Sequence, residues 1–308
     1  PLLVATAEGC GGFDWDDSAY ERAYAELEHS LLGAERTYAA VAPLVGLVVG
    51  TQVELGRGIR VRLAVAGELA AHWPEATGLL PKDFGRERDQ LGVIELERTL
   101  PAGEHEPPDA PGELADAISA LRLATSGAIS AGPVIFERLD WRPFGIKAVL
   151  PIAATQPPGE STRLDQFRGQ LARDLLERLG QADDDPELAE ALDRWELSLF
   201  AAEPYRSEQL RESLVALLGE GDGVWAAALR TALLLGEADG DRARLLQGLR
   251  RLARGGEADE LAQGALRRAL VEVLVHGDRP ALVESLDEAL LGLRPRPAGY
   301  FALRAATA

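Results

Sequence analysis

Three polar residues with the chemistry for proton transfer and phosphate binding, Arg268, Glu272 and His276, follow one another at four-residue intervals. Apolar residues recur around them at helical spacing, which predicts a helix that ends before Gly277. Side chains four residues apart share one helix face, so we expect a single polar stripe. In a metal-independent ribonuclease, the histidine would handle the proton of the 2′-hydroxyl or leaving oxygen, and the arginine would stabilise charge on the phosphate.

The same stripe has a purely structural interpretation. A histidine in the last turn of a helix is favoured by the helix dipole, and Glu272 one turn earlier can bond to His276. The stripe by itself therefore leaves a catalytic and a structural hypothesis open.

A second candidate site is a run of five arginines with no acidic residue among them, in an otherwise acidic chain. The five are Arg242, Arg244, Arg250, Arg251 and Arg254. Such a run is typical of a solvated helix face whose arginines extend over apolar surface, and also of a strip that contacts RNA or a partner protein. Both interpretations are kept.

Composition limits the classes of function. The chain has 308 residues, and 46% apolar content is enough for a real core. A net charge of −18 disfavours non-specific attraction to nucleic acid or to an anionic membrane. Cys10 is the sole cysteine, so no intrachain disulfide can form. The first residues lack a secretory pattern and the longest apolar run is too short to cross a bilayer, so we expect a cytoplasmic protein without a membrane partner.

Other motifs that bind metals or cofactors are missing from the sequence. The four histidines, at 29, 72, 105 and 276, lie far apart and have no cysteine companions, so no zinc pattern exists. Asp14, Asp16 and Asp17 lack the spacing of a calcium loop, and the glycines near Gly9 are not followed by the Lys-Ser/Thr of a phosphate-binding loop. We expect no metal and no cofactor.

The pattern of the N-terminal third predicts both helices and strands. An amphipathic pattern over 16–41 predicts a helix, whereas the apolar run 44–53 and the alternating segment 59–65 predict strands. Segment 93–97 predicts a further strand, and the intervening residues predict a short helix at 67–73 and a loop at 74–88.

Two segments rich in proline and charge, 101–113 and 154–163, predict domain boundaries. We therefore expect an α+β protein with an N-terminal strand-containing domain at 1–112, a connector at 113–163 and an all-α bundle at 164–308. The connector is predicted to contain a helix at 113–125 and extended segments at 133–139 and 145–154. The bundle is predicted to contain six or seven short helices that end at glycine or proline.

The order of these segments is similar to that of a known family. A strand-bearing N-terminal region precedes LRLAT at 121–125, WAAALRTALLLGE at 225–237, a helix ending in VHG at 275–277 and a short last helix. This order resembles the Apea-like HEPN proteins, with 164–297 as the HEPN bundle and 57–70 similar to their upstream accessory region. The resemblance implies an all-α bundle that often dimerises. In catalytic relatives it implies a ribonuclease site in which an Arg, usually followed by a polar residue, precedes a His by four to six intervening residues, with both protomers contributing.

The chain departs from that pattern at the arginine. The positions that would carry it are Ala269, Leu270 and Val271, and Arg268 is separated from His276 by seven residues. The first hypothesis is therefore a non-catalytic HEPN-like binding or regulatory protein that contacts RNA or a protein, in defence or stress as the relatives imply. The second is a diverged metal-independent ribonuclease that uses Arg268, Glu272 and His276. The third is a scaffold or oligomer component without nucleic-acid contact.

Overall fold

The computed structural model describes residues 2–10, 14–32, 35–64, 68–69, 92–101, 106–140, 142–155, 157–158 and 160–299. The chain forms two compact units. The first comprises Pro1–Ile118, Ile129–Thr155 and Ser161–Gly169, and the second comprises Ser119–Ala128, Gln156–Glu160 and Gln170–Ala308. The predicted loop at 74–88 and nearly all of the short helix at 67–73 lie outside the described residues.

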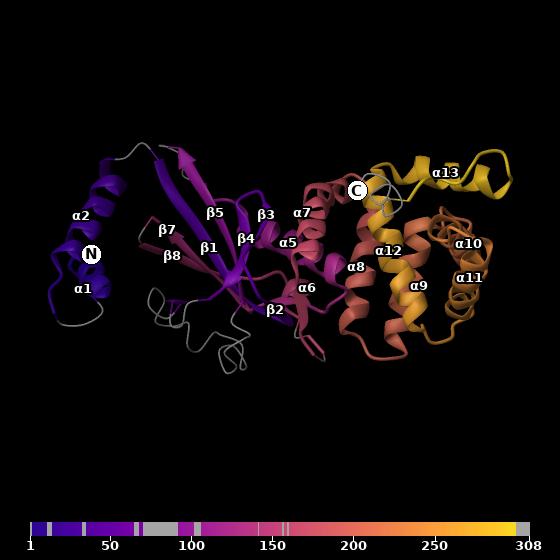
Figure 1. Ribbon diagram of the computed structural model, residues 1–308, viewed down its shortest axis with the longest axis horizontal. Helices are drawn as coiled ribbons and strands as arrows, with labels where there is room; N and C mark the ends of the chain where they lie inside the picture. Colours follow the sequence, from indigo (N-terminus) through magenta and orange to yellow (C-terminus); the bar gives the residue numbers. More distant parts are fainter. Residues whose placement is uncertain are drawn as a thin grey trace. The chain divides into compact units, whose positions relative to one another are not determined.

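The first unit contains an antiparallel sheet in the order β3-β4-β5-β1-β7-β8, with β6 paired to β1 (Figure 1). Its strands are β1 (Glu35–Val45), β3 (Val53–Gly56), β4 (Ile59–Leu63), β5 (Gly92–Pro101), β6 (Ser130–Ala131), β7 (Val134–Leu139) and β8 (Arg142–Ala148). Strands β2 (Leu47–Val49) and β9 (Thr162–Leu164) form a separate parallel pair. Strands β6, β7 and β8 come from the predicted connector, so that segment completes the sheet.

The alternation in β4 determines how this strand sits in the sheet. Ile59 and Val61 are fully buried, whereas Arg60 and Arg62 point to the opposite face. There both arginines bind the carboxylate of Glu95 in β5, at 2.8 and 2.7 Å. The predicted strands at 59–65 and 93–97 are thus confirmed within the described residues, and a buried carboxylate joins them on the polar side.

The helix predicted over 16–41 is wrong in its second half. The helix α2 (Asp17–Leu32) is preceded by α1 (Leu2–Cys10), and β1 begins at Glu35. Residues of β1 pair with β5 on one side and with β7 on the other, so the strand is central and buried on both faces. A central strand is a continuous apolar run that resembles a buried helix in sequence, and only the pairing separates the two.

A second correction concerns the extended segment predicted at 145–154. Strand β8 ends at Ala148, and Pro151–Ala154 forms the short helix α6. Pro151 stands at the first helical position, where its fixed φ suits a helix and its missing N–H is not needed.

In the described residues of the second unit all regular elements are helices, as predicted, and the α+β class is confirmed. After α7 (Gln166–Leu179) and the 3₁₀ turn η1 (Gly180–Asp183) come α8 (Pro186–Phe200), α9 (Tyr205–Leu218), α10 (Gly223–Leu235), α11 (Asp239–Ala253), α12 (Glu260–His276) and α13 (Arg279–Leu290). The helix α5 (Ala110–Thr125) begins inside the segment 101–113 that was predicted to be a linker. Its residues up to Ile118 belong to the first unit, and those from Ser119 belong to the second. Within the described residues, no helix is long and apolar enough to cross a membrane.

Aspartates define the starts of three helices in this unit. The side chains of Asp185, Asp259 and Asp278 accept hydrogen bonds from backbone N–H groups in the first turns of α8, α12 and α13. Ser207, by contrast, does not cap α9, because that helix already begins at Tyr205. Its hydroxyl instead donates to Glu203 at 2.6 Å and accepts from the backbone N–H of Ala258 at 2.8 Å.

Candidate functional site on the helical unit

Helix α12 places Arg268, Glu272 and His276 at successive turns, as the spacing predicts. Most of its other side chains between Ala262 and Leu274 are buried, so this helix forms the centre of the bundle. The three polar residues nevertheless have different surroundings.

Arg268 is half-buried and directed at the end of α10. Its Nη2 lies 3.5 Å from the carbonyl oxygen of Leu235, the last residue of that helix. The side chain also lines a cavity of about 290 Å³ together with Glu237, Asp241 and Arg244. Arg268 from the predicted α12 stripe and Arg244 from the predicted arginine run thus line the same cavity. The carboxylates of Glu237 and Asp241 line it as well.

Glu272 is buried, with 7% of its surface exposed. The backbone of Gly299 passes so close that an added Cβ would stand 3.2 Å from Oε1 of Glu272. This packing closes the middle of the stripe to solvent, so a ligand could not extend along all three residues without displacing the segment at Gly299.

His276 is exposed at the end of α12. Its Nδ1 lies 3.2 Å from the carbonyl oxygen of Asp278, which accepts a hydrogen bond when Nδ1 carries the ring hydrogen. The following residue, Gly277, has φ +83° and ends the helix in the left-handed conformation. A different cavity of about 380 Å³ opens at this turn, lined by Gly277, Asp278 and Arg279.

Three arginines gather at the carboxyl end of α10. Arg242 donates to the carbonyl of Gly236 at 3.0 Å, Arg296 donates to those of Leu234 and Gly236 at 3.1 Å each, and Arg268 approaches Leu235. The last carbonyls of a helix have no partner within the helix and carry its negative dipole end. Arg242 and Arg268 therefore serve a structural purpose at this helix end.

The five arginines of α11 and its end divide into two groups. Arg242, Arg244 and Arg251 each face a carboxylate, from Asp239, Asp241 and Asp259 respectively, at 2.9–3.3 Å. Arg250 and Arg254 are exposed, and the described residues contain no ion pair for either of them. Of these five arginines, Arg250 and Arg254, one helical turn apart, are the two without an ion pair in the described part of the chain, and they are available to an external partner.

Arg254 also marks an aromatic contact. Its guanidinium carbon lies 5.7 Å from the ring centroid of Trp225, which is 45% exposed at the start of α10. At the other end of the pair, Arg242 near the start of α11 bonds to Gly236 at the end of α10. These two contacts show that α10 and α11 run antiparallel and side by side (Figure 1).

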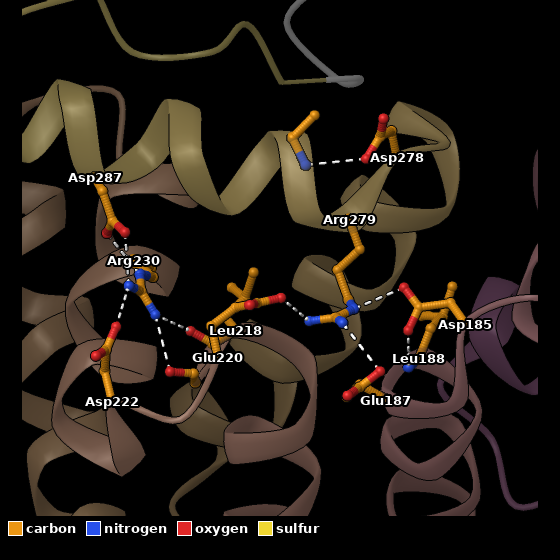
Figure 2. Close-up of polar contacts among 12 residues, drawn as sticks. Asp185, Glu187, Leu188, Leu218, Glu220, Asp222, Arg230, Asp278, Arg279 and Asp287 are labelled. Atoms are coloured by element: carbon orange, nitrogen blue, oxygen red, sulfur yellow. Dashed lines mark hydrogen bonds and ion pairs between the residues drawn. The ribbon is translucent and has the colours of Figure 1, made fainter.

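Arg230 is buried on the other side of α10. Its guanidinium forms two parallel bonds to Asp287 of α13 at 2.7 Å, a bond to Asp222 at 2.6 Å and bonds to the carbonyls of Leu218 and Gly219 (Figure 2). The hydrogen bonds that Arg230 donates to Asp287, together with its other carboxylate contacts, raise the pKa of Arg230 despite burial. This arginine joins α9, α10 and α13.

Arg279 is a second buried junction, at the start of α13. Its three nitrogens bind Asp185 at 2.7 Å, Glu220 at 2.9 Å and Glu187 at 3.3 Å (Figure 2). Burial acts to raise the pKa of Asp185, but the bond from Arg279 and the helix N–H of Leu188 lower it below the ordinary value. All three guanidinium nitrogens thus face carboxylates. Among the charged side chains that line the cavity at Gly277, Arg279 is the one cation and the others are acidic.

The sequence patterns did not single out Arg230 or Arg279. They favoured a core position for Trp225, because it lies inside an apolar helical pattern, but its side chain is 45% exposed. The signal for Arg230 was present, because it is the only charged residue between Val224 and Leu235, inside an otherwise apolar helix. No group of three or more histidine, cysteine, aspartate or glutamate side chains within the described parts of the chain is arranged to hold a metal ion. No protein-family model, curated protein or solved structure matches the chain.

Proposed function

We propose that this protein is a non-catalytic binding or regulatory protein, with a HEPN-like helical unit that contacts its partner through the exposed surface of α10 and α11. The observation that carries the proposal is the division of the arginines. Arg250 and Arg254 are exposed without a carboxylate partner, whereas Arg268 is directed at the carbonyl of Leu235.

The arrangement of α12 supports the non-catalytic part of the proposal. General acid–base chemistry on a phosphodiester needs the proton-transferring group and the cation within reach of one phosphate. His276 lies beside the carbonyl of Asp278, Arg268 borders a different cavity, and buried Glu272 separates them. A ribonuclease built on this stripe would have to rearrange all three.

The composition of the α10–α11 surface supports the binding part. Tryptophan and arginine are the residues most enriched among those that dominate binding energy at protein interfaces. Trp225 and Arg254 already contact each other, so little side-chain entropy is lost when a partner covers them. The strong negative charge of the whole chain opposes a long polyanion and favours a partner with a short, localised acidic segment.

The first test separates binding from catalysis. Labelled total RNA is incubated in EDTA with the purified wild type and with His276→Ala prepared identically. We expect the same absence of cleavage in both samples. Specific cleavage by the wild type that disappears in His276→Ala would contradict the proposal and support the diverged ribonuclease.

The second test addresses the surface itself. Arg250→Glu/Arg254→Glu is compared with Arg194→Glu/Arg211→Glu, which makes the same change of net charge at partly exposed, ion-paired arginines of α8 and α9. Binding of labelled RNA and of acidic peptides is measured by fluorescence anisotropy at several salt concentrations. A loss confined to the first variant is expected for at least one of these probes; equal behaviour of the two variants with every probe would remove the binding role of α11.

A further inference from the structure

We propose that the α10–α11 surface binds helix α2 of a second copy of this chain. This inference rests on the binding role proposed above for Arg250 and Arg254, and it names the partner. It is carried by two exposed faces of one sequence that match in spacing and have opposite charge.

The first face, the α10–α11 seam, consists of Trp225, Leu229, Arg250 and Arg254. Trp225 and Leu229 lie one turn apart on α10, 45% and 39% exposed. Arg250 and Arg254 lie one turn apart on α11 and its end, both exposed. Arg254 lies over Trp225, and the two helices run antiparallel. Arg250, one turn before Arg254 on α11, is therefore level with Leu229, one turn after Trp225 on α10. The seam therefore presents an apolar row beside a basic row.

The second face, the α2 ladder, begins with the aromatic residues Trp15, Tyr20 and Tyr24. The ring centroids of Trp15 and Tyr20 are 5.4 Å apart and those of Tyr20 and Tyr24 are 6.1 Å apart. Trp15 is 58% exposed and Tyr24 is 49% exposed. Buried Ala19 and Ala23 lie about 100° around the helix axis from Tyr20 and Tyr24. The packed face of α2 is therefore next to the tyrosine row, and the rings of Trp15 and Tyr24 remain exposed.

An acidic row runs beside these aromatic rings. Asp17, Glu21 and Glu28 follow each other at four and seven residues, so they share one stripe next to Tyr20 and Tyr24. All three are exposed. The Asp17 carboxylate accepts a hydrogen bond from Nε1 of Trp15 at 2.7 Å, which ties the acidic row to the aromatic one.

The two faces complement each other row by row. Two acidic residues one turn apart on α2 match two arginines one turn apart on α11, and the Cβ atoms of each pair are about 6 Å apart. In this arrangement the side chains of Tyr20 and Tyr24 pack against Trp225 and Leu229, which are exposed and can be covered by a partner. A helix laid along such a groove with an apolar row and a charged row is a common mode of recognition. A nucleic acid would instead continue past two cations onto a surface bearing Asp222, Asp239 and Asp241.

The experiment uses charge reversal on each face of the full-length chain. Arg250→Glu/Arg254→Glu reverses the seam and Asp17→Arg/Glu21→Arg reverses the ladder. Association is measured by analytical ultracentrifugation from nanomolar to high micromolar concentration. We expect the wild type to associate and each reversed variant alone to have its dissociation constant raised at least about tenfold, because like charges then oppose each other.

Mixing the two reversed variants is the decisive step, because each presents the partner charges that the other lacks. An equimolar mixture is expected to recover association, which neither a folding defect nor a contact within one chain would produce. Trp225→Ala should weaken association about tenfold or more without altering the circular dichroism spectrum. Arg194→Glu/Arg211→Glu, with an equal change of net charge, should associate as the wild type does.

Three outcomes would overturn the inference: a wild type that stays monomeric throughout, a reversed variant that associates normally, or a mixture that fails to recover. The proposed binding function fails on a different result, namely RNA and peptide binding that is indifferent to Arg250→Glu/Arg254→Glu. A monomeric chain that binds RNA through these arginines would thus reject the second copy as partner and retain the binding function.

Discussion

Nη1 of Arg122 and Oε2 of Glu196 lie 2.8 Å apart, with side-chain exposures of only 0% and 4%. The guanidinium carbon of Arg122 is also 4.8 Å from the centre of the Phe200 ring. Burial raises the pKa of Glu196 and lowers that of Arg122, while their mutual attraction acts in the opposite direction on both. Within the helical unit this pair joins the C-terminal part of α5 to α8.

Breaking this pair from one side is expected to be more harmful than replacing it entirely. Glu196→Leu leaves a buried guanidinium uncompensated, which should reduce the free energy of unfolding by about 3–5 kcal/mol. The double variant Arg122→Met/Glu196→Leu removes both charges, so it should recover most of that loss. Urea denaturation followed by circular dichroism measures the two differences, and a double variant no more stable than the single one would contradict this account.

The junction at Arg279 should matter more than an ordinary surface ion pair. Arg279→Ala removes the cation from three carboxylates and frees the start of α13, and we expect a loss of about 2 kcal/mol. Arg294 is the matched control, because its pair with Glu288 is 64% exposed on the arginine side. Arg294→Ala should change stability by less than about 0.5 kcal/mol. Hydrogen exchange of α13 amides should accelerate only in Arg279→Ala.

Two glycines, one inside α12 and one at its C-terminal cap, should respond oppositely to substitution by alanine. Gly277 has φ +83°, so Gly277→Ala forces a side chain into the left-handed conformation and should cost about 1–2 kcal/mol. Gly264 lies inside the helix, where an added Cβ meets nothing within 4 Å. Gly264→Ala should therefore stabilise the protein by about 0.5–1 kcal/mol. Thermal unfolding of the two variants provides the comparison, and shifts of the same sign would refute it.

The sheet of the first unit should be sensitive to acid through Glu95. Burial acts to raise its pKa, but hydrogen bonds from Arg60 and Arg62 together lower it below the ordinary value of 4.5. Because the folded pKa is lower than the unfolded one, the stabilisation is present above about pH 4.5 and is lost as pH falls through the folded value. Hydrogen exchange of β4 and β5 amides between pH 3 and pH 6 should show this loss. In Glu95→Gln the same amides should be less protected at pH 6, and their opening free energy should vary less with pH.

The sequence by itself determined the helical half. Leucine periodicity, aspartate caps and glycine ends specify α8 to α13 locally, since a helix closes its hydrogen bonds within its own segment. It also determined that Arg268, Glu272 and His276 would occupy successive turns of one helix. The alternation of Ile59 and Val61 with arginines likewise predicted β4 before its neighbours were known.

Only the tertiary structure decided what those residues contact. The hydrogen bonds of a strand come from distant segments, so β1 could be separated from a helix only once β5 and β7 were paired with it. Whether an arginine binds the carbonyls at a helix end, a carboxylate or neither depends on groups far away in the sequence. Arg296 binds Leu234, 62 positions away, and Arg279 binds Asp185, 94 positions away. The spacing of Arg250 and Arg254 was therefore visible in the chain, but their freedom from ion pairs among the described residues, and the tryptophan beneath one of them, emerged from packing.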